Sequence, residues 1–121
     1  MHLTTLYPPA PPLTGFDVLV SAEGPDTVVA LRGEADTATV AAIVDALAGV
    51  IADRDGNVIV DLAQTAFLDT AALRAVLRAR EVLDAGQREL TLRSPSRIAG
   101  RLLAVFELSH LVSPAPQSVV R

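Results

Sequence analysis

The chain alternates between short runs of β-branched and apolar residues and longer segments in which apolar residues recur every three or four positions. The runs FDVLVSA (16–22) and TVVALRG (27–33) flank EGPD, whose Gly-Pro pair marks a turn. This arrangement predicts an antiparallel hairpin. Two further strands are predicted at NVIVDL (57–62) and RELTLR (88–93). The first is almost wholly apolar, as expected of a strand buried on both faces.

Three segments have the apolar spacing of amphipathic helices. The first follows Asp36 or Thr37 as its N-cap, and the second runs from about Ala71 to Ala85. The third begins at Ser94-Pro95, where the hydroxyl caps and proline takes the first helical position. The predicted inner stripes are Val40, Ile43, Val44, Leu47, Val50 and Ile51; Leu73, Val76, Leu77 and Leu83; and Ile98, Leu102, Val105 and Phe106.

The resulting order, β-β-α-β-α-β-α, predicts one α/β domain with α+β character, in which helices pack on a mixed sheet of four to five strands. A length of 121 residues suits a single domain. Residues 1–14 contain PPAPP and are expected to be a disordered leader. Residues 113–121, which include two prolines, are expected to be a flexible tail. The folded domain is therefore placed at 15–112.

The composition disfavours several classes of function. Net charge is −4, the ten basic residues are all Arg, and only 3% of residues are aromatic, which argues against nucleic-acid binding. There is no cysteine, and the two histidines are not at ligand spacing, so no metal or cofactor is expected. The sequence shows neither a signal peptide nor a run of about 20 apolar residues, so we expect a cytoplasmic protein.

The most informative stretch is FLDTAAL (67–73), where a strand leads into a helix. Asp69 and Thr70 at this junction allow three interpretations. In the first, one of the two residues only caps the helix. In the second, Asp69 acts as a base for a Thr70 nucleophile. In the third, Thr70 is a phosphorylation site. The catalytic interpretation lacks a neighbouring histidine or lysine, and we expect that the protein is not an enzyme.

Phosphorylation is compatible with the local sequence. A phosphate on Thr70 would lie near the positive end of the following helix. Arg74, four residues on, and Arg78, one turn further, lie on the same helix face and could pair with the phosphate or with an acidic partner. The same arginines could also belong to an ordinary solvated face.

Three segments in order resemble the STAS domain, and most closely the free-standing anti-sigma factor antagonists of bacteria. LRGEAD (31–36) is similar to the family's strand ending in a Gly-Glu-x-Asp turn, and VIVDLAQTAFLDTAAL (58–73) to its strand, loop and phosphorylation motif. LRSPSRIAGRLLAVFELSHLV (92–112) is similar to its last strand and helix. The resemblance covers residues 16–112, nearly all of the predicted domain.

The resemblance implies a role in transcription regulation by partner switching. Unmodified, such a protein binds an anti-sigma factor, a serine/threonine kinase of the histidine-kinase-like ATPase fold, and so releases a sigma factor. The kinase phosphorylates the hydroxyl after the motif aspartate, here Thr70, and a phosphatase resets it. The partner-binding residues implied by the family are Glu34, Asp36, Asp69, Thr70, Ala71, Ala72 and Arg74.

The chain departs from the family's pattern at four positions. The acceptor Thr70 stands where Ser is commoner. Ala71 and Ala72 stand where the family usually has Ser or Thr and then Gly, and His110 stands where it often has Gly. A methyl at Ala72 could obstruct an approaching kinase. The alternative is therefore a constitutive STAS interaction or scaffold module of a stress-signalling complex, in which Thr70 is not phosphorylated.

Overall fold

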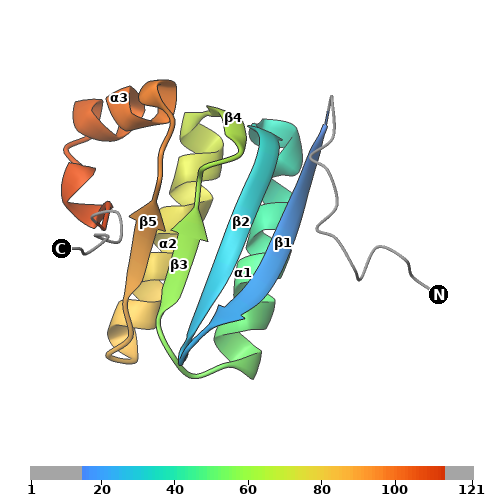
Figure 1. The fold of residues 1–121 in the computed structure, drawn as a ribbon, viewed down its shortest axis with the longest axis vertical. Helices are drawn as coiled ribbons and strands as arrows, with labels where there is room; N and C mark the ends of the chain where they lie inside the picture. Colours follow the sequence, from blue (N-terminus) through green and yellow to red (C-terminus); the bar gives the residue numbers. More distant parts are fainter. Residues whose placement is uncertain (1–14, 114–121) are drawn as a thin grey trace, which may run out of the picture.

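The structure is a computed structural model that describes residues 15–113. Figure 1 shows a single sheet with α1 and α2 on one face, while α3 lies beyond the end of the sheet where β4 is found. The elements are β1 (Phe16–Glu23), β2 (Asp26–Ala35), the short 3-10 helix η2 (Thr37–Thr39), α1 (Val40–Asp53), β3 (Val58–Asp61), β4 (Thr65–Leu68), α2 (Thr70–Ala85), β5 (Leu90–Arg93), α3 (Arg97–Val105) and the 3-10 helix η3 (Ser109–Leu111).

The predicted fold class and element order are confirmed. The sheet has five strands in the order β1-β2-β3-β5, with β4 also paired to β2. β1 and β2 form the expected antiparallel hairpin, and every other strand pair is parallel. The connections from β2 to β3 and from β3 to β5 run through α1 and α2, so both helices return over the same face. The sheet is therefore mixed, as the sequence indicated.

The strand β4 was not predicted. After β3, a tight turn in which the Thr65 N–H donates to the Leu62 carbonyl starts a second strand along β2. The buried Thr65 hydroxyl fixes this strand by donating to the Leu31 carbonyl oxygen at 2.6 Å. Thus β3 and β4 pair with successive parts of β2, and β4 brings the FLDTAAL segment to the end of that strand.

Gly33 marks the point on β2 where its parallel pairing becomes irregular. The register with β4 shifts between Gly33 and Glu34, and Gly33 has a φ of +104°. A Cβ at Gly33 would clash with the Gly15 carbonyl oxygen. Both the positive φ and this close approach require glycine at this position of β2.

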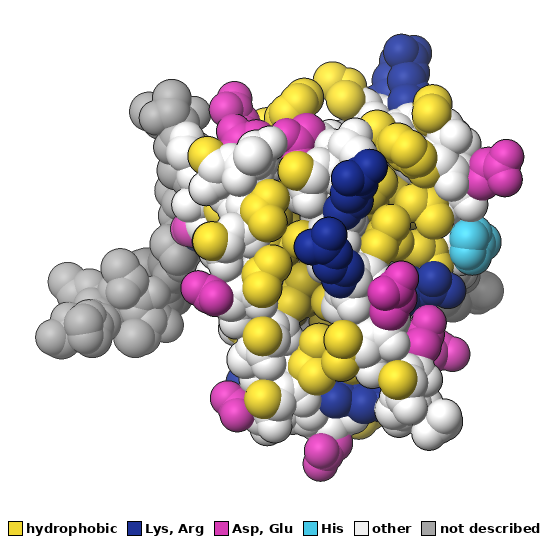
Figure 2. Space-filling view, turned by 180° about the vertical axis from the view of Figure 1, so that it is seen from behind, with side chains coloured by type: hydrophobic (Ala, Val, Ile, Leu, Met, Phe, Trp, Pro, Cys, Tyr) yellow, Lys and Arg dark blue, Asp and Glu magenta, His cyan; other side chains and the backbone are white. Residues whose placement is uncertain are grey.

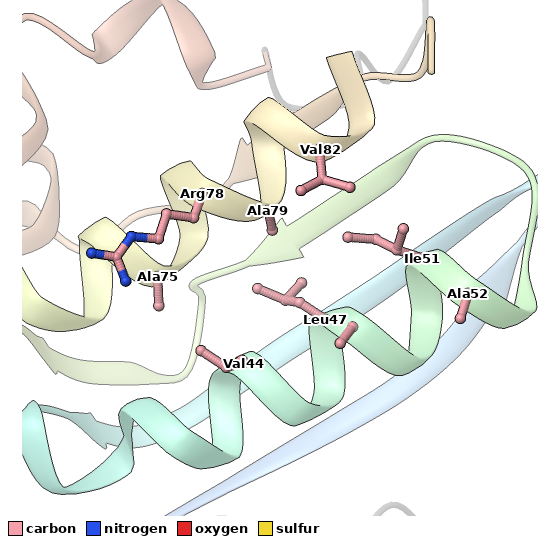
Figure 3. Close-up of a pocket in the computed structure, with 9 residues that line it drawn as sticks. Val44, Leu47, Ile51, Ala52, Ala75, Arg78, Ala79 and Val82 are labelled. Atoms are coloured by element: carbon pink, nitrogen blue, oxygen red, sulfur yellow. The ribbon is translucent and has the colours of Figure 1, made fainter. Parts of the chain in front are cut away.

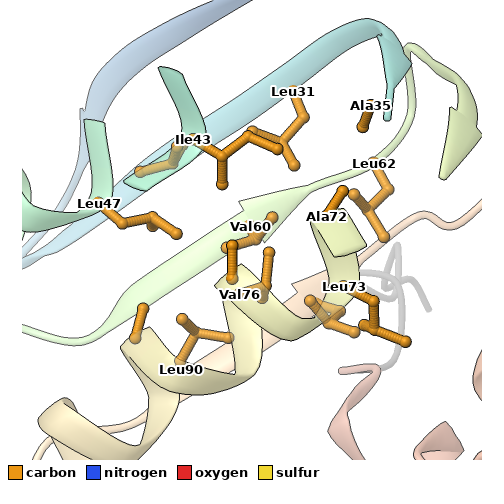
Figure 4. Close-up of a cluster of buried hydrophobic side chains, with 14 of the residues drawn as sticks. Leu31, Ala35, Ile43, Leu47, Val60, Leu62, Ala72, Leu73, Val76 and Leu90 are labelled. Carbon is orange, nitrogen blue, oxygen red and sulfur yellow. The ribbon is translucent and has the colours of Figure 1, made fainter. Parts of the chain in front are cut away.

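The core lies between the sheet and the two large helices. Leu31 on β2 and Val60 on β3 project toward Ile43 and Leu47 on α1 and toward Val76 on α2 (Figure 4), and all five side chains are at most 2% exposed. Because successive residues of a strand point to opposite faces, β2 also buries Arg32 on the other face. The stripes predicted for the first two helices are largely correct, although Val44 is 44% exposed.

The predicted inner face of α3 is wrong at three of its four positions, and only Leu102 packs against the core. Ile98, Val105 and Phe106 are 60%, 75% and 47% exposed, whereas Ala99 and Leu103 are buried. The helix has apolar residues on more than one face, so periodicity alone could not decide which face packs inward. The structure places the smaller Ala99 against the core and leaves larger apolar side chains on the surface.

The predicted start of α3 is also wrong. The N-cap is Ser96, whose hydroxyl accepts from the Ala99 N–H at 3.1 Å, and Arg97 is the first helical residue. Ser94 instead has a φ of +56° and lies in the loop between β5 and α3. The described chain continues to Ser113, whose N–H donates to the Leu92 carbonyl. The predicted leader and all but the first residue of the predicted tail lie outside the described residues.

Candidate functional site

The residues singled out from the sequence meet at one edge of the sheet, where β2 and β4 end. Glu34 pairs with Phe67 and Ala35 with Leu68 across these two strands. The Asp69 N–H then donates to the Ala35 carbonyl oxygen at 3.0 Å. We call this edge the acidic rim and define it by Glu34, Asp36, Asp69 and Thr70. In Figure 2, acidic side chains gather at this end of the molecule, at the upper left.

Asp69 is the N-cap of α2. One oxygen of its carboxylate accepts from the Ala72 N–H at 3.0 Å, and the other accepts from the Thr37 hydroxyl at 3.4 Å. The capping interpretation of the Asp69-Thr70 pair is thereby confirmed for Asp69. The contact with Thr37 was not predicted, because it joins residues 32 positions apart. One carboxylate therefore holds together the beginnings of α2 and of η2.

Asp36 begins η2, the short helix that precedes α1. Its N–H donates to the Thr39 hydroxyl at 2.9 Å, and the Thr39 N–H donates to the Asp36 carbonyl oxygen at 3.0 Å. One oxygen of the Asp36 carboxylate is buried and has no hydrogen-bond partner. The backbone of this turn is thus well fixed, while part of its negative charge is left uncompensated.

Thr70 is the first residue of α2 and is half-buried, as is Ala71. Its position places the hydroxyl beside the free N–H groups and the positive end of a 16-residue helix. Ala72 is 0% exposed and packs in the core. The expectation that its methyl faces an approaching partner is therefore wrong, and of Ala71 and Ala72 only Ala71 has a side chain that reaches the surface.

Arg74 and Arg78 follow Thr70 at successive turns of α2, and both are exposed. Neither belongs to the ion pairs formed within residues 15–113. Figure 2 shows basic side chains in the middle of the helical face with hydrophobic atoms on both sides. The first of the two arginines lies one turn from Thr70, within reach of an anionic group attached there.

An exposed aromatic residue that sequence reasoning missed adjoins the acidic rim. Phe67 is 44% exposed on β4, two residues before Asp69 and opposite the exposed Glu34. The burial pattern of β4 is buried, exposed, exposed, buried, and because this does not alternate, the sequence TAFL carried no signal for the exposure of Phe67. Exposed aromatic side chains are frequent anchors of protein interfaces.

Two other kinds of site have no support in the part of the chain that the structure describes. Between residues 15 and 113, no three His, Asp or Glu side chains cluster in a way that could hold a metal ion. Over the same residues, no helix combines the length and the hydropathy needed to cross a membrane.

Comparisons with known proteins agree with the observed fold. The structure of an anti-sigma factor antagonist from Mycobacterium paratuberculosis matches with a TM-score of 0.78 and 21% identity, over 88% of this chain and 92% of that chain. Unphosphorylated SpoIIAA, an anti-sigma factor antagonist, matches with a TM-score of 0.71 and 19% identity, over 85% and 90%. Phosphorylated SpoIIAA from Bacillus matches with a TM-score of 0.66, 19% identity, and 85% and 93%. A search of curated proteins finds no match.

A family model described as "Mlab, STAS domain" matches residues 18–113. This range begins in β1 and runs through η3, so it includes the acidic rim and all three helices. The resemblance inferred from the three sequence segments is confirmed at the level of the family. Because the match spans most of the chain, the protein belongs to the STAS domain family.

Proposed function

We propose that this protein is an anti-sigma factor antagonist of the cytoplasm that acts by partner switching. In its unmodified form it binds an anti-sigma factor, a serine/threonine kinase of the histidine-kinase-like ATPase fold, and so frees a sigma factor. Phosphorylation of Thr70 by that kinase ends the interaction, and a phosphatase restores it. The observation that carries the proposal is the meeting of Glu34, Asp36, Asp69 and Thr70 on one rim.

The composition of the rim suits a protein partner. Its carboxylates lie beside the exposed Phe67, which combines charge for orientation with an aromatic anchor. Ala71 and Arg74 extend the surface along the first turns of α2. Ala72 contributes to the interaction only by holding this helix start in place, since its side chain is buried.

The position of Thr70 suits a reversible switch. A phosphate adds about 1.5 to 2 negative charges, which the N-terminus of α2 and Arg74 can accommodate in the free protein. In the complex, the same phosphate would lie between carboxylates, in an interface that excludes water. Burying that charge costs several kcal/mol, and each 1.4 kcal/mol lowers affinity about tenfold.

The proposal is tested by incubating the protein with ATP, magnesium and each candidate anti-sigma kinase, and measuring the intact mass of the product. We expect one added phosphate on the wild type and none on Thr70→Ala. Ser21→Ala, which removes an exposed hydroxyl from β1, is the matched control and should gain the phosphate. Binding to a kinase without any gain of mass would support the constitutive interaction module instead.

A further inference from the structure

A second surface of the molecule is an apolar groove between α1 and α2. The cavity has a volume of about 360 Å³, within the roughly 300–1,000 Å³ typical of small-molecule sites. Its floor is formed by the buried Leu47, Ala75 and Ala79. The partly exposed Val44 of α1 and Val82 of α2 lie on opposite walls of the groove (Figure 3).

Small side chains give the groove its shape. Ala48 and Ala52 form the outer part of the groove wall on α1. Because these side chains are small, the groove between the two helices stays open, and larger side chains here would fill it. From Val44 to Ala52 the groove follows α1 for eight residues, which at 1.5 Å per residue is about 12 Å. An apolar groove of this length can hold a linear hydrocarbon chain along α1.

The charged group in the lining is Arg78. Its side chain runs along α2 toward the end of the groove marked by Ala75 and Val44 (Figure 3). It belongs to none of the ion pairs within residues 15–113. A guanidinium at one end of an apolar groove complements a molecule that carries a carboxylate at one end of an apolar chain.

We propose that the groove binds a single-chain carboxylic acid, a fatty acid of medium length. The carboxylate pairs with Arg78 at the Val44 end, and the chain lies over Leu47 and Ala79 toward Ile51 and Val82. Burial of the chain against apolar side chains supplies the affinity, and the guanidinium fixes its direction. This site is separate from the proposed partner-switching role and does not depend on it.

The test is a calorimetric titration of the full chain with dodecanoate, below the concentration at which dodecanoate aggregates. We expect saturable binding of one molecule per chain. Arg78→Gln should weaken binding about tenfold, as expected for loss of a hydrogen bond to a charged group. Ala48→Phe, which fills the groove from the exposed side of α1, should abolish binding.

Matched variants separate this site from general effects of charge and bulk. Arg101→Gln removes an exposed arginine from α3, and Ala41→Phe adds the same ring to an exposed position of α1 outside the groove. Both should bind dodecanoate as the wild type does, and circular dichroism should show that every variant is folded. The inference is overturned if dodecanoate does not saturate the protein, if neither groove variant weakens binding, or if dodecanol binds as tightly as dodecanoate.

Discussion

The Asp69 N–H donates to the carbonyl oxygen of Ala35, which ties the first residue before α2 to the last residue of β2. From the sequence alone, the end of β2 and the start of α2 could be predicted only as separate segments. This hydrogen bond joins them. It makes the Gly-Glu-Ala-Asp end of one strand and the Asp-Thr start of one helix a single surface.

Asp69→Ala should destabilise the protein by about 1 kcal/mol, because the Ala72 N–H loses its cap and Thr37 loses its acceptor. Urea unfolding at neutral pH measures the change. Asp45→Ala, at an exposed position of α1, is the control and should change the free energy of unfolding by less than about 0.5 kcal/mol. Equal losses in the two variants would contradict the capping role.

Two glycine substitutions should have opposite effects. Gly33→Ala should cost at least about 2 kcal/mol, because alanine is strained at a φ of +104° and its Cβ meets the Gly15 carbonyl. Gly49→Ala should stabilise by about 0.5–1 kcal/mol, since its added methyl meets nothing within 4 Å in the middle of α1. The pair is compared by urea unfolding, and a Gly33→Ala protein as stable as the wild type would show that the backbone at Gly33 does not need a positive φ.

Asp17 should contribute to stability in a pH-dependent way. Two hydrogen bonds from the buried Arg32 guanidinium hold the pKa of Asp17 below its ordinary value of 3.8. Since the folded pKa is the lower one, the contribution is fully present above the unfolded pKa and is lost as pH falls through the folded pKa. In the wild type, the free energy of unfolding should therefore fall on acidification below about pH 4.

Asp17→Asn should remove this part of the acid dependence and also lower stability at pH 7, because Arg32 loses its carboxylate. The measurement is urea unfolding at several pH values between 3 and 7. Asp45→Asn is the control and should keep the wild-type profile. A wild-type slope in Asp17→Asn would assign the acid dependence to other carboxylates.

Arg88 should contribute more to the free energy of unfolding than a loop arginine usually does. Its guanidinium donates to the carbonyl oxygens of Ile51, Arg54 and Gly56 at 2.8–3.1 Å, and so it satisfies the C-terminal end of α1 and the turn after it. Arg88→Ala should destabilise by about 1–3 kcal/mol in urea unfolding. Arg97→Ala, which removes an exposed arginine with no ion pair in residues 15–113, should be close to neutral.

The sequence predicted the sheet and the first two helices because their apolar spacing agrees with their burial. Ile43, Leu47 and Val76 are buried as their period requires. In α3 the apolar spacing did not identify the buried face, because Ile98 and Leu102 have the same spacing as the buried Ala99 and Leu103. Only the packing of a nine-residue helix against the rest of the fold decides between such faces.

The acidic rim could be predicted only in part, because some of its contacts are local in sequence and others join distant segments. Asp69 and Thr70 stand at a recognisable strand-to-helix junction, so their place at a helix start follows from local sequence. The bond from Thr37 to Asp69 and the pairing of Glu34 with Phe67 join distant segments, and no periodicity encodes them. They depend on β4, a four-residue strand too short to show a pattern of its own.

We propose that the Thr70 hydroxyl controls a protein-binding surface at the acidic rim. The most direct measurement is the affinity of an anti-sigma factor for the unmodified protein and for the protein phosphorylated at Thr70, with Ser21→Ala treated in parallel. We expect phosphorylation to weaken binding at least about tenfold, and Phe67→Ala to weaken binding by the unmodified protein. Equal affinity of the two forms would show that Thr70 does not control binding at the acidic rim.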